Sequence, residues 1–373
     1  MRSFALCFAA VPDPRAGNAR HDLSELLFVA FASVLCGAET CEDMAAFGAA
    51  KQAVLRRVLR LRHGTPSHDT FSRVFRLLDP VAFEAAFRRF AEAFAAHLSG
   101  RVGLAGQQVA IDGKSLAGAF ARGARATPLH LVTAWAVGQR LVLAQRVAPG
   151  RSEVTAALAV VDLLDLEGAT VTADALHGSR RMAAAVRARG GDYVLALKGN
   201  RGPFHREAVG LLAGVPAVAV ERDGGVSHGR RERREGVVVP VAEDWRARFG
   251  FDGLAAVARI DSTCGPAGRQ AGQAERRTTR YFALSRVLPA ERALAVVRGH
   301  WGIENQQHWL LDVVLHEDAA RTRKDNGAQN VALLRRLALN VLNADAYKAS
   351  IRRKIKRAGW EDAYLLSLLC QMR

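Results

Sequence analysis

The sequence predicts a mixed α/β core that is preceded by an all-helical segment. Up to residue 100, apolar side chains recur at helical spacing and no strand-like run is present. Between residues 103 and 200, short β-prone runs alternate with helical patterns, as is typical of an α/β core. With 373 residues, 50% of them hydrophobic, the chain is long enough to bury a large core.

The expected elements follow from apolar spacing and from turn residues. The helical segment should contain helices at residues 23–36, 42–61, 70–78 and 81–98, and should close at Ser99-Gly100. The core should follow the order β-β-β-α-β-α-β, with strands at 107–111, 129–137, 140–147, 169–173 and 193–197 and helices at 153–164 and 179–189. Residues 202–280 read as a mainly β insertion, helices follow from Pro289 and over 330–342, and residues 351–357 (IRRKIKR) form a basic end.

The chain is strongly basic, with 53 Lys and Arg against 36 Asp and Glu and a net charge of +17. This excess favours a polyanionic partner, with nucleic acid ahead of a membrane surface, and an Arg-rich background composition is the alternative interpretation. Five scattered cysteines without a C-x-x-C pair argue against a disulfide framework and a structural zinc site. The most apolar stretch, 23–36, is short and contains Glu25, so we expect no membrane segment and a cytoplasmic, nucleoid-associated protein.

Two aspartates follow predicted strands, which is where α/β proteins bind ligands. Asp112 follows the strand QQVAI, and Asp174 follows ATVTA. Either one alone is more often a helix cap or a turn former. Together with Glu304 on a later helix, they could hold two divalent cations about 3.5–4 Å apart, as in-line phosphodiester displacement requires. Oxygen ligands suit Mg²⁺, for which Mn²⁺ can substitute.

Glu304 lies in the run HWGIENQQHW, residues 300–309. On an α-helix, His300, Glu304, His308 and Asp312 share one face because they are four residues apart. This pattern fits a metal-holding edge, a hydrogen-bonded structural seam, or chance. Because a two-metal site prefers oxygen ligands, we expect His300 and His308 to support the carboxylates through their ring N–H groups.

Longer stretches of the sequence carry a resemblance to a known family. They are VPDPRAGNARHDLSELL, PSHDTFSRVFRLLDP, IDGKSLAG, TADALH, YVLALKGN, HGRRERR, RGHWGIENQQHWLLDVVLHEDAARTRK and NVALLRRLALN, in that order. Together they resemble the DDE transposases of bacterial insertion sequences, in the ISAs-type group that contains the H-repeat-associated proteins of Rhs elements. The resemblance extends over nearly the whole chain.

The resemblance implies a ribonuclease H-like mixed-sheet catalytic core at residues 103–345, interrupted by the β-rich insertion at about 202–280. It also implies a helical, DNA-binding N-terminal domain at residues 1–102, and it leaves residues 346–373 as a basic tail. Carried over residue by residue, the catalytic and metal-binding triad of this family maps to Asp112, Asp174 and Glu304.

Histidines and basic residues near these positions are further candidates. His177 is expected to orient a carboxylate, as are His300 and His308, and a solvated loop position is the alternative for His177. DNA contact is predicted for Lys114, Lys198, Arg230, Arg231 and Arg298, and a solvated face is the alternative for the arginine run.

We therefore predict an Mg²⁺-dependent transposase that cleaves double-stranded DNA at the terminal repeats of its element and joins the freed ends to target DNA. A homodimer or a higher oligomer is expected on the DNA. Two alternatives stay open: a stand-alone metal-dependent DNA nuclease of the same fold, and a catalytically silent DNA-binding relic.

Overall fold

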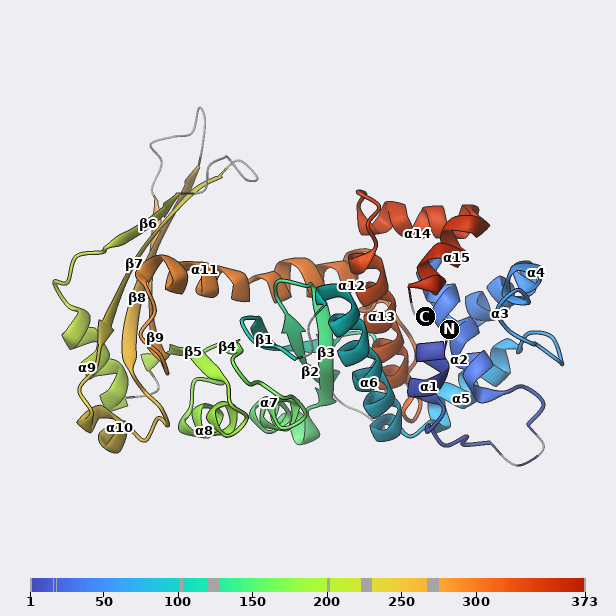
Figure 1. Cartoon of the computed structure of the whole chain (residues 1–373), viewed down its shortest axis with the longest axis horizontal. Helices are drawn as coiled ribbons and strands as arrows, with labels where there is room; N and C mark the ends of the chain where they lie inside the picture. Colours follow the sequence, from blue (N-terminus) through green and yellow to red (C-terminus); the bar gives the residue numbers. More distant parts are fainter. Residues whose placement is uncertain are drawn as a thin grey trace. The chain divides into compact units, whose positions relative to one another are not determined.

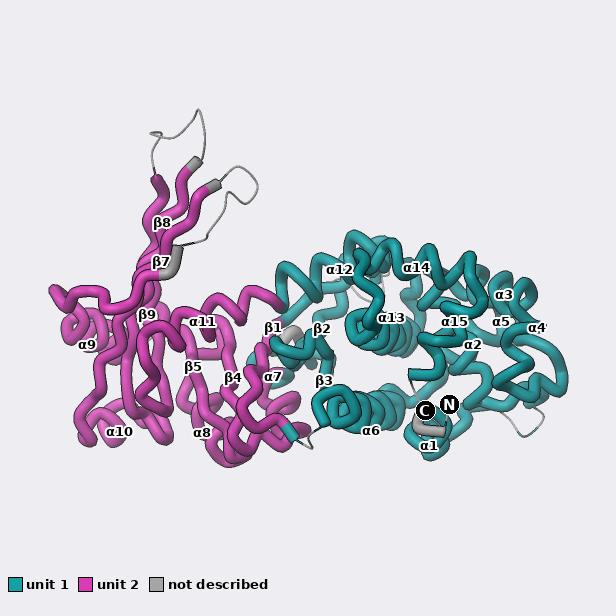
Figure 2. The backbone as a smooth tube through the Cα atoms, turned by 45° about the horizontal axis from the view of Figure 1, so that its top comes forward, with its two compact units in different colours: residues 1–103, 113–156, 303–373 teal, residues 104–112, 157–302 magenta. Residues whose placement is uncertain are grey.

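A computed structural model of the chain describes residues 2–15, 17, 19–100, 103–119, 128–199, 202–222, 230–266 and 275–371. The chain forms two compact units, which Figure 2 shows in different colours. Unit 1 comprises residues 1–103, 113–156 and 303–373, and unit 2 comprises residues 104–112 and 157–302. The chain passes between the units inside strand β1 (Gln108–Leu116) and inside helix α7 (Glu153–Val161).

The N-terminal part of unit 1 is helical, as predicted. Its helices are α1 (Arg2–Phe8), α2 (Leu23–Leu35), α3 (Cys41–Ala50), α4 (Gln52–Leu55), α5 (His68–Leu77) and α6 (Pro80–Ser99). The single helix expected over residues 42–61 is wrong, because α3 ends at Ala50 and α4 is one short turn. The carboxylate of Glu25 accepts the backbone N–H groups of Arg60 and Leu61, so these amides are satisfied without a helix.

The remainder of unit 1 is organised around one buried helix. The elements are the hairpin β2 (Leu129–Ala136) and β3 (Leu141–Val147), then α12 (Trp309–Val313), α13 (Gly327–Ala344), α14 (Ile351–Trp360) and α15 (Asp362–Cys370). Helix α13 packs against α2, α5, α6 and β3 (Figure 1). The side chain of Asn340 on α13 forms two hydrogen bonds with the β3 backbone at Val142. Its Oδ1 accepts from Val142 N at 2.7 Å, and its Nδ2 donates to Val142 O at 2.8 Å. Residues 346–373, expected to be a basic tail, include α14 and α15, and Lys354 of α14 is buried.

Unit 2 contains a mixed sheet. Its strands lie in the order β1, β4 (Thr170–Ala173), β5 (Asp192–Leu197), β9 (Arg276–Leu284), β8 (Ala256–Pro266), β7 (Arg230–Pro240) and β6 (Ala219–Arg222). Strands β1, β4 and β5 are parallel, and each later pair is antiparallel. The predicted order β-β-β-α-β-α-β is confirmed, with α7 before β4 and α8 (Arg180–Ala188) before β5.

The stretch 202–280 enlarges this sheet. It contains α9 (Gly202–Leu212), α10 (Asp244–Phe249), strands β6 to β8 and part of β9, and β9 pairs directly with β5. Helix α11 (Ala290–His300) contacts β4, β6 and β7. Leu294 and Val297 of α11 are buried in one apolar cluster with Ile260 and Phe282 of the strands. The helix that precedes the glutamate is thus fixed on the sheet of unit 2.

Strand β1 was expected to end at Asp112, and this expectation is wrong because the strand continues to Leu116. Alternate residues beyond Asp112 are buried, namely Lys114 and Leu116. Asp-Gly is an ordinary turn signal, which is why the sequence predicts an end here. The strand continues because the core of unit 1 supplies partners for the residues that follow.

Candidate active site

Asp112 lies on strand β1 of unit 2, and Asp174 directly follows the neighbouring parallel strand β4. The register of β1 and β4 pairs Ile111 with Ala173, and each aspartate is the next residue along its strand direction. Neighbouring strands lie about 4.8 Å apart, so the two residues stand side by side at the carboxyl ends of the paired segments. Asp112 is partly exposed and Asp174 is exposed. The structure therefore brings these two predicted residues together.

Asp174 begins a short loop that holds its carboxylate through the backbone. Its Oδ1 accepts the N–H groups of Leu176 at 2.9 Å and His177 at 3.3 Å. Its Oδ2 forms no hydrogen bond with a residue that the structure describes, and half of the side chain (50%) is exposed. A Cβ added at Gly178 would lie 2.1 Å from the carbonyl oxygen of Ala196 on β5, so only glycine lets this loop approach the strand.

Two polar side chains, half-buried Gln108 and buried Thr172, fix helix α11 on the sheet. Gln108 of β1 donates through Nε2 to Val296 O at 2.7 Å and to Thr172 Oγ1 at 3.2 Å. A Cβ at Gly299 would lie 2.5 Å from Gln108 Oε1, which shows how closely the helix approaches β1. Thr172 Oγ1 is also 3.1 Å from His300 Nδ1. Gln108 and Thr172 were not predicted from the sequence, although a polar residue within each apolar strand was a signal for them.

His300 and His177 both lie near Asp174. Burial lowers the pKa of His300 to about 4, while Asp174 acts to raise this pKa and His177 acts to lower it further. His300 is consequently neutral at neutral pH, and its Nδ1 pairs with a threonine hydroxyl rather than a carboxylate. The His177 side chain is fully buried, with Nε2 at 3.9 Å from Asp174 Oδ1, which is too long for a hydrogen bond. Support of the carboxylates by these rings stays a prediction.

The predicted DNA-binding residues of unit 2 differ in their setting. Lys198 is exposed directly after β5, and it therefore lies at the edge of the parallel strands that also carries Asp174. Arg298 is exposed on α11, and Arg231 is exposed on β7. The backbone of Arg230 pairs with Pro266, and its side chain lies outside the described residues. DNA contact by all four stays a prediction.

Glu304 belongs to unit 1, whereas the two aspartates belong to unit 2. It is exposed on a π-helical segment, η4 (Ile303–His308), that leads into α12. A π-helix closes its hydrogen bonds over five residues and not four. The α-helical face predicted for His300, Glu304 and His308 is therefore wrong in this segment. Single π turns occur frequently at functional sites.

Lys114, predicted to contact DNA, lies within a group of carboxylates in unit 1. Its Nζ is 2.7 Å from Asp312 Oδ1, 2.8 Å from Asp318 Oδ1 and 3.8 Å from Glu317 Oε2. Burial lowers the pKa of Lys114, but the carboxylates outweigh this effect and the net pKa is raised. Arg336 completes the group, with Nη1 at 2.6 Å from Glu317 Oε1. With its side chain 7% exposed, Lys114 is better placed to hold these carboxylates than to reach a phosphate.

Two more histidines of unit 1 lie beside this group. Burial lowers the pKa of His308 to about 3, with further lowering by Arg336 and Lys114. His130 on β2 is 2.9 Å from Ser115 Oγ through Nδ1 and 2.8 Å from Glu153 Oε2 through Nε2. The pairing of His130 with Ser115 and Glu153 was not predicted from the sequence, although a histidine in the apolar run LHLVTAWA was a signal for it.

The chemistry of the two aspartates fits a hard divalent cation. They provide carboxylate oxygens on a shared sheet edge, and Asp174 keeps Oδ2 clear of the described residues. Across the residues that the structure describes, no three His, Cys, Asp or Glu side chains are grouped so as to hold a metal ion. Glu304 as the third ligand thus stays a prediction.

Comparison with known proteins gives consistent matches. The family model described as Transposase DDE domain matches residues 104–341, and the model described as DDE_Tnp_1-associated matches residues 5–91. YbfL of Escherichia coli (strain K12) is 31% identical over 367 residues, covering 96% of this chain and 95% of that protein. The H repeat-associated protein YhhI of the same strain is also 31% identical, with the same two coverages. A protein of the dhlA 3′ region of Xanthobacter autotrophicus is 40% identical over 267 residues, or 68% of this chain and 86% of that one.

Among solved structures, the piggyBac transposase synaptic complex with hairpin DNA has a TM-score of 0.47 at 10% identity. The alignment covers 98% of this chain and 77% of that chain. In the described part of this chain, no helix has both the length and the apolar run needed to span a bilayer.

Proposed function

Because the chain belongs to the transposase DDE domain family, we propose that it cleaves DNA at the ends of its own insertion element and joins those ends to target DNA. The observation that carries this proposal is that Asp112 and Asp174 each follow a member of the register pair Ile111 and Ala173 on parallel strands. Two carboxylates on one sheet edge, in a chain of net charge +17, suit phosphodiester chemistry on a polyanion.

In this proposal Asp112, Asp174 and Glu304 hold Mg²⁺, for which Mn²⁺ can substitute. When bound, the metal would activate the attacking hydroxyl or water and stabilise the leaving oxygen. Oxygen ligands and a phosphodiester substrate are what these hard cations prefer.

The surrounding residues of the chain have supporting roles. The backbone amides of Leu176 and His177 hold Asp174 by one oxygen and orient the other. His300 is neutral at neutral pH, so it places no positive charge beside Asp174 to compete with a cation. Exposed Lys198 lies on the same sheet edge and would bind a phosphate beside the scissile bond. Arg231 and Arg298, both exposed, would also contact DNA.

The test uses the purified protein, DNA that carries the element's terminal repeats, a target plasmid and Mg²⁺, with Asp112→Ala as the control. Joined products that disappear in the control support transposition. Nicked DNA without joined products would instead support the stand-alone nuclease. If no metal-dependent product forms with any of these DNAs, both enzymatic proposals fail and the DNA-binding relic is favoured. Native mass measurement on repeat DNA then tests the expected homodimer or higher oligomer.

A further inference from the structure

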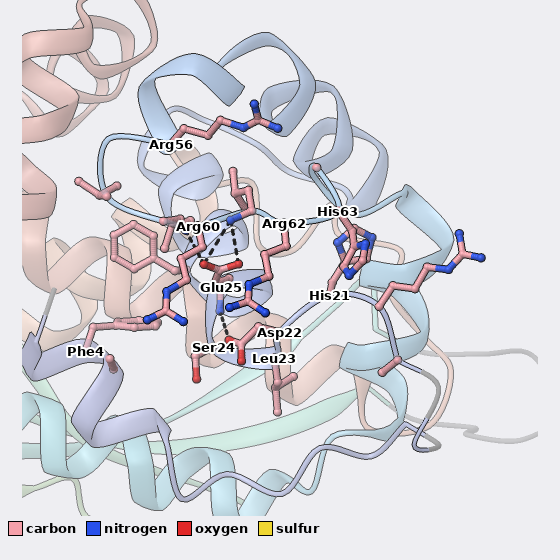
Figure 3. Close-up of a pocket in the computed structure, with 18 of the residues that line it drawn as sticks. Phe4, His21, Asp22, Leu23, Ser24, Glu25, Arg56, Arg60, Arg62 and His63 are labelled. Atoms are coloured by element: carbon pink, nitrogen blue, oxygen red, sulfur yellow. Dashed lines mark hydrogen bonds between the residues drawn. The ribbon is translucent and has the colours of Figure 1, made fainter.

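A large hollow lies in the N-terminal helical part of unit 1, and the proposed chemistry does not use it (Figure 3). Its volume is about 1150 Å³, and the start of α2 and the loop of residues 56–64 form much of its lining. Five arginines line it together with His21 and His63: they are Arg20, Arg56, Arg57, Arg60 and Arg62. Three carboxylates line it as well, so arginine is in excess.

Those three carboxylates are already engaged. Asp13 pairs with Arg15 at 2.7 Å, and Asp22 caps α2 by accepting the N–H of Glu25 at 2.9 Å. Glu25 accepts the backbone N–H groups of the loop at Arg60 (2.6 Å) and at the next residue. The five lining arginines are exposed, and they form no ion pair with any residue in the described ranges. Their guanidinium groups are available to an external anion.

The loop backbone fixes the positions from which two of these arginine side chains extend. Leu61 has a positive φ of 44° and a side chain that is only 3% exposed. A non-glycine residue in this conformation persists where its surroundings fix it, and here Glu25 accepts the N–H of Leu61 at 3.1 Å. The buried Leu61 side chain leaves Arg60 and Arg62 on its two sides, and Figure 3 shows both extending past Glu25. Because this backbone is already fixed, it loses less conformational entropy when an anion binds than a flexible loop would lose.

The aromatic residues of the hollow indicate which part of a nucleic acid it suits. Phe4 and Phe28 are each only 2% exposed, and their ring centroids are 5.2 Å apart. Phe4 also stacks on Phe8 at 4.3 Å. Sites that bind single strands provide exposed aromatic rings on which bases stack. These buried phenylalanine rings offer no such face. Arginines do suit the oxygens of phosphate groups, which they contact with two parallel hydrogen bonds.

We propose that this hollow binds the phosphate backbone of duplex DNA through Arg60 and Arg62, without reading the base sequence. The proposal shares its DNA partner with the proposed function, but it depends on neither the carboxylates nor a metal. The volume exceeds that of most small-molecule pockets, about 300–1,000 Å³, and suits an extended polyanion. Burial and the charges of Arg15 and His63 lower the pKa of His21, so a bound phosphate should raise that pKa.

The test measures duplex binding by the full-length protein in EDTA, over a series of salt concentrations, by fluorescence anisotropy. The probe is a duplex of about 30 base pairs without terminal repeats, so that binding rests on phosphate contacts alone. The Arg60→Gln, Arg62→Gln double variant should bind about tenfold more weakly. Its slope of log K against log salt should be shallower by about 1 to 2, because each phosphate contact contributes about 0.9.

Arg73→Gln is the matched control, because Arg73 is exposed on α5 and does not line the hollow. It should change neither affinity nor slope. An unchanged slope in the double variant, or an equal loss in the control, would overturn the proposal. Loss of inorganic phosphate binding with duplex binding intact would assign the hollow to a small anion and also overturn it. Each single variant is measured in parallel, so that a folding defect in the double variant does not decide the result. Since the assay contains no metal, a chain that binds DNA here but never cleaves it contradicts only the proposed function.

Discussion

Asp112 and Asp174 each stand one residue beyond a pair of register partners, Ile111 and Ala173, on the parallel strands β1 and β4. The hydrogen bonds of the sheet therefore set the distance between the two aspartates. Sites built on such strands are more precise than sites built on loops.

Removal of either aspartate should weaken metal binding, which can be measured without a catalytic assay. We expect Asp112→Asn and Asp174→Asn each to lower the affinity for Mn²⁺ by about tenfold or more, because each removes one charged oxygen ligand. Titration followed by electron paramagnetic resonance measures this affinity. Asp165→Asn, an exposed aspartate elsewhere in unit 2, should leave it unchanged. Equal Mn²⁺ affinity in the wild type and in all three variants would contradict a metal site at these aspartates.

Loss of Lys114 should destabilise unit 1. Lys114→Met keeps most of the side-chain length but leaves Asp312 and Asp318 without their ammonium partner. Breaking a buried ion pair from one side costs about 3–5 kcal/mol, and we expect the lower end because Asp312 and Asp318 are partly exposed. Urea unfolding measures the change in the free energy of unfolding. The matched variant Lys198→Met, at an exposed site, should stay within about 0.5 kcal/mol of wild type.

Gly178 should be required for the loop that carries Asp174. In Gly178→Ala the new Cβ would meet the carbonyl oxygen of Ala196 at 2.1 Å, so the loop must move away from β5. We expect a loss of about 1–3 kcal/mol in stability together with weaker Mn²⁺ binding. Gly210→Ala is the matched control, since nothing lies within 4 Å of its added Cβ in helix α9. That change should stabilise the protein by up to about 1 kcal/mol.

His308 should make the stability of the protein depend on pH below neutrality. Its pKa is about 3 in the folded protein, against an ordinary value of about 6.5 in the unfolded chain. Between these values the unfolded state binds more protons, so the free energy of unfolding falls as the pH falls below about 6.5. This histidine alone contributes a slope of up to about 1.4 kcal/mol per pH unit. The slope between about pH 7 and pH 5 should be smaller in His308→Gln, and equal slopes in the two proteins would contradict the prediction.

Local patterns predicted much of the fold, and distant contacts account for most of the differences. The β2–β3 hairpin and strands β4 and β5 were predictable from apolar runs and turn residues. The continuation of β1 past Asp112 was not, because the partner of Lys114 at Asp318 is 204 residues away. The π turn at Ile303–His308 was hidden because a spacing of four residues implies an α-helix. Both aspartates of the candidate site were predicted from the sequence. That they lie next to each other depends on the register between β1 and β4, which no local sequence pattern shows.

The central position of α13 has a consequence for the synthesis of this protein. Asn330 donates to the carbonyl oxygens of Phe75 and Leu78, and Asn340 forms hydrogen bonds with both the N–H and the carbonyl oxygen of Val142. The helices made first therefore depend on a helix that is synthesised much later in the chain. Until then the apolar surface of α2 that α13 covers is exposed, and it is a target for chaperones or aggregation. A chain that stops before residue 327 would lack this helix altogether, so truncated copies of the gene should yield unstable protein rather than a partly active one.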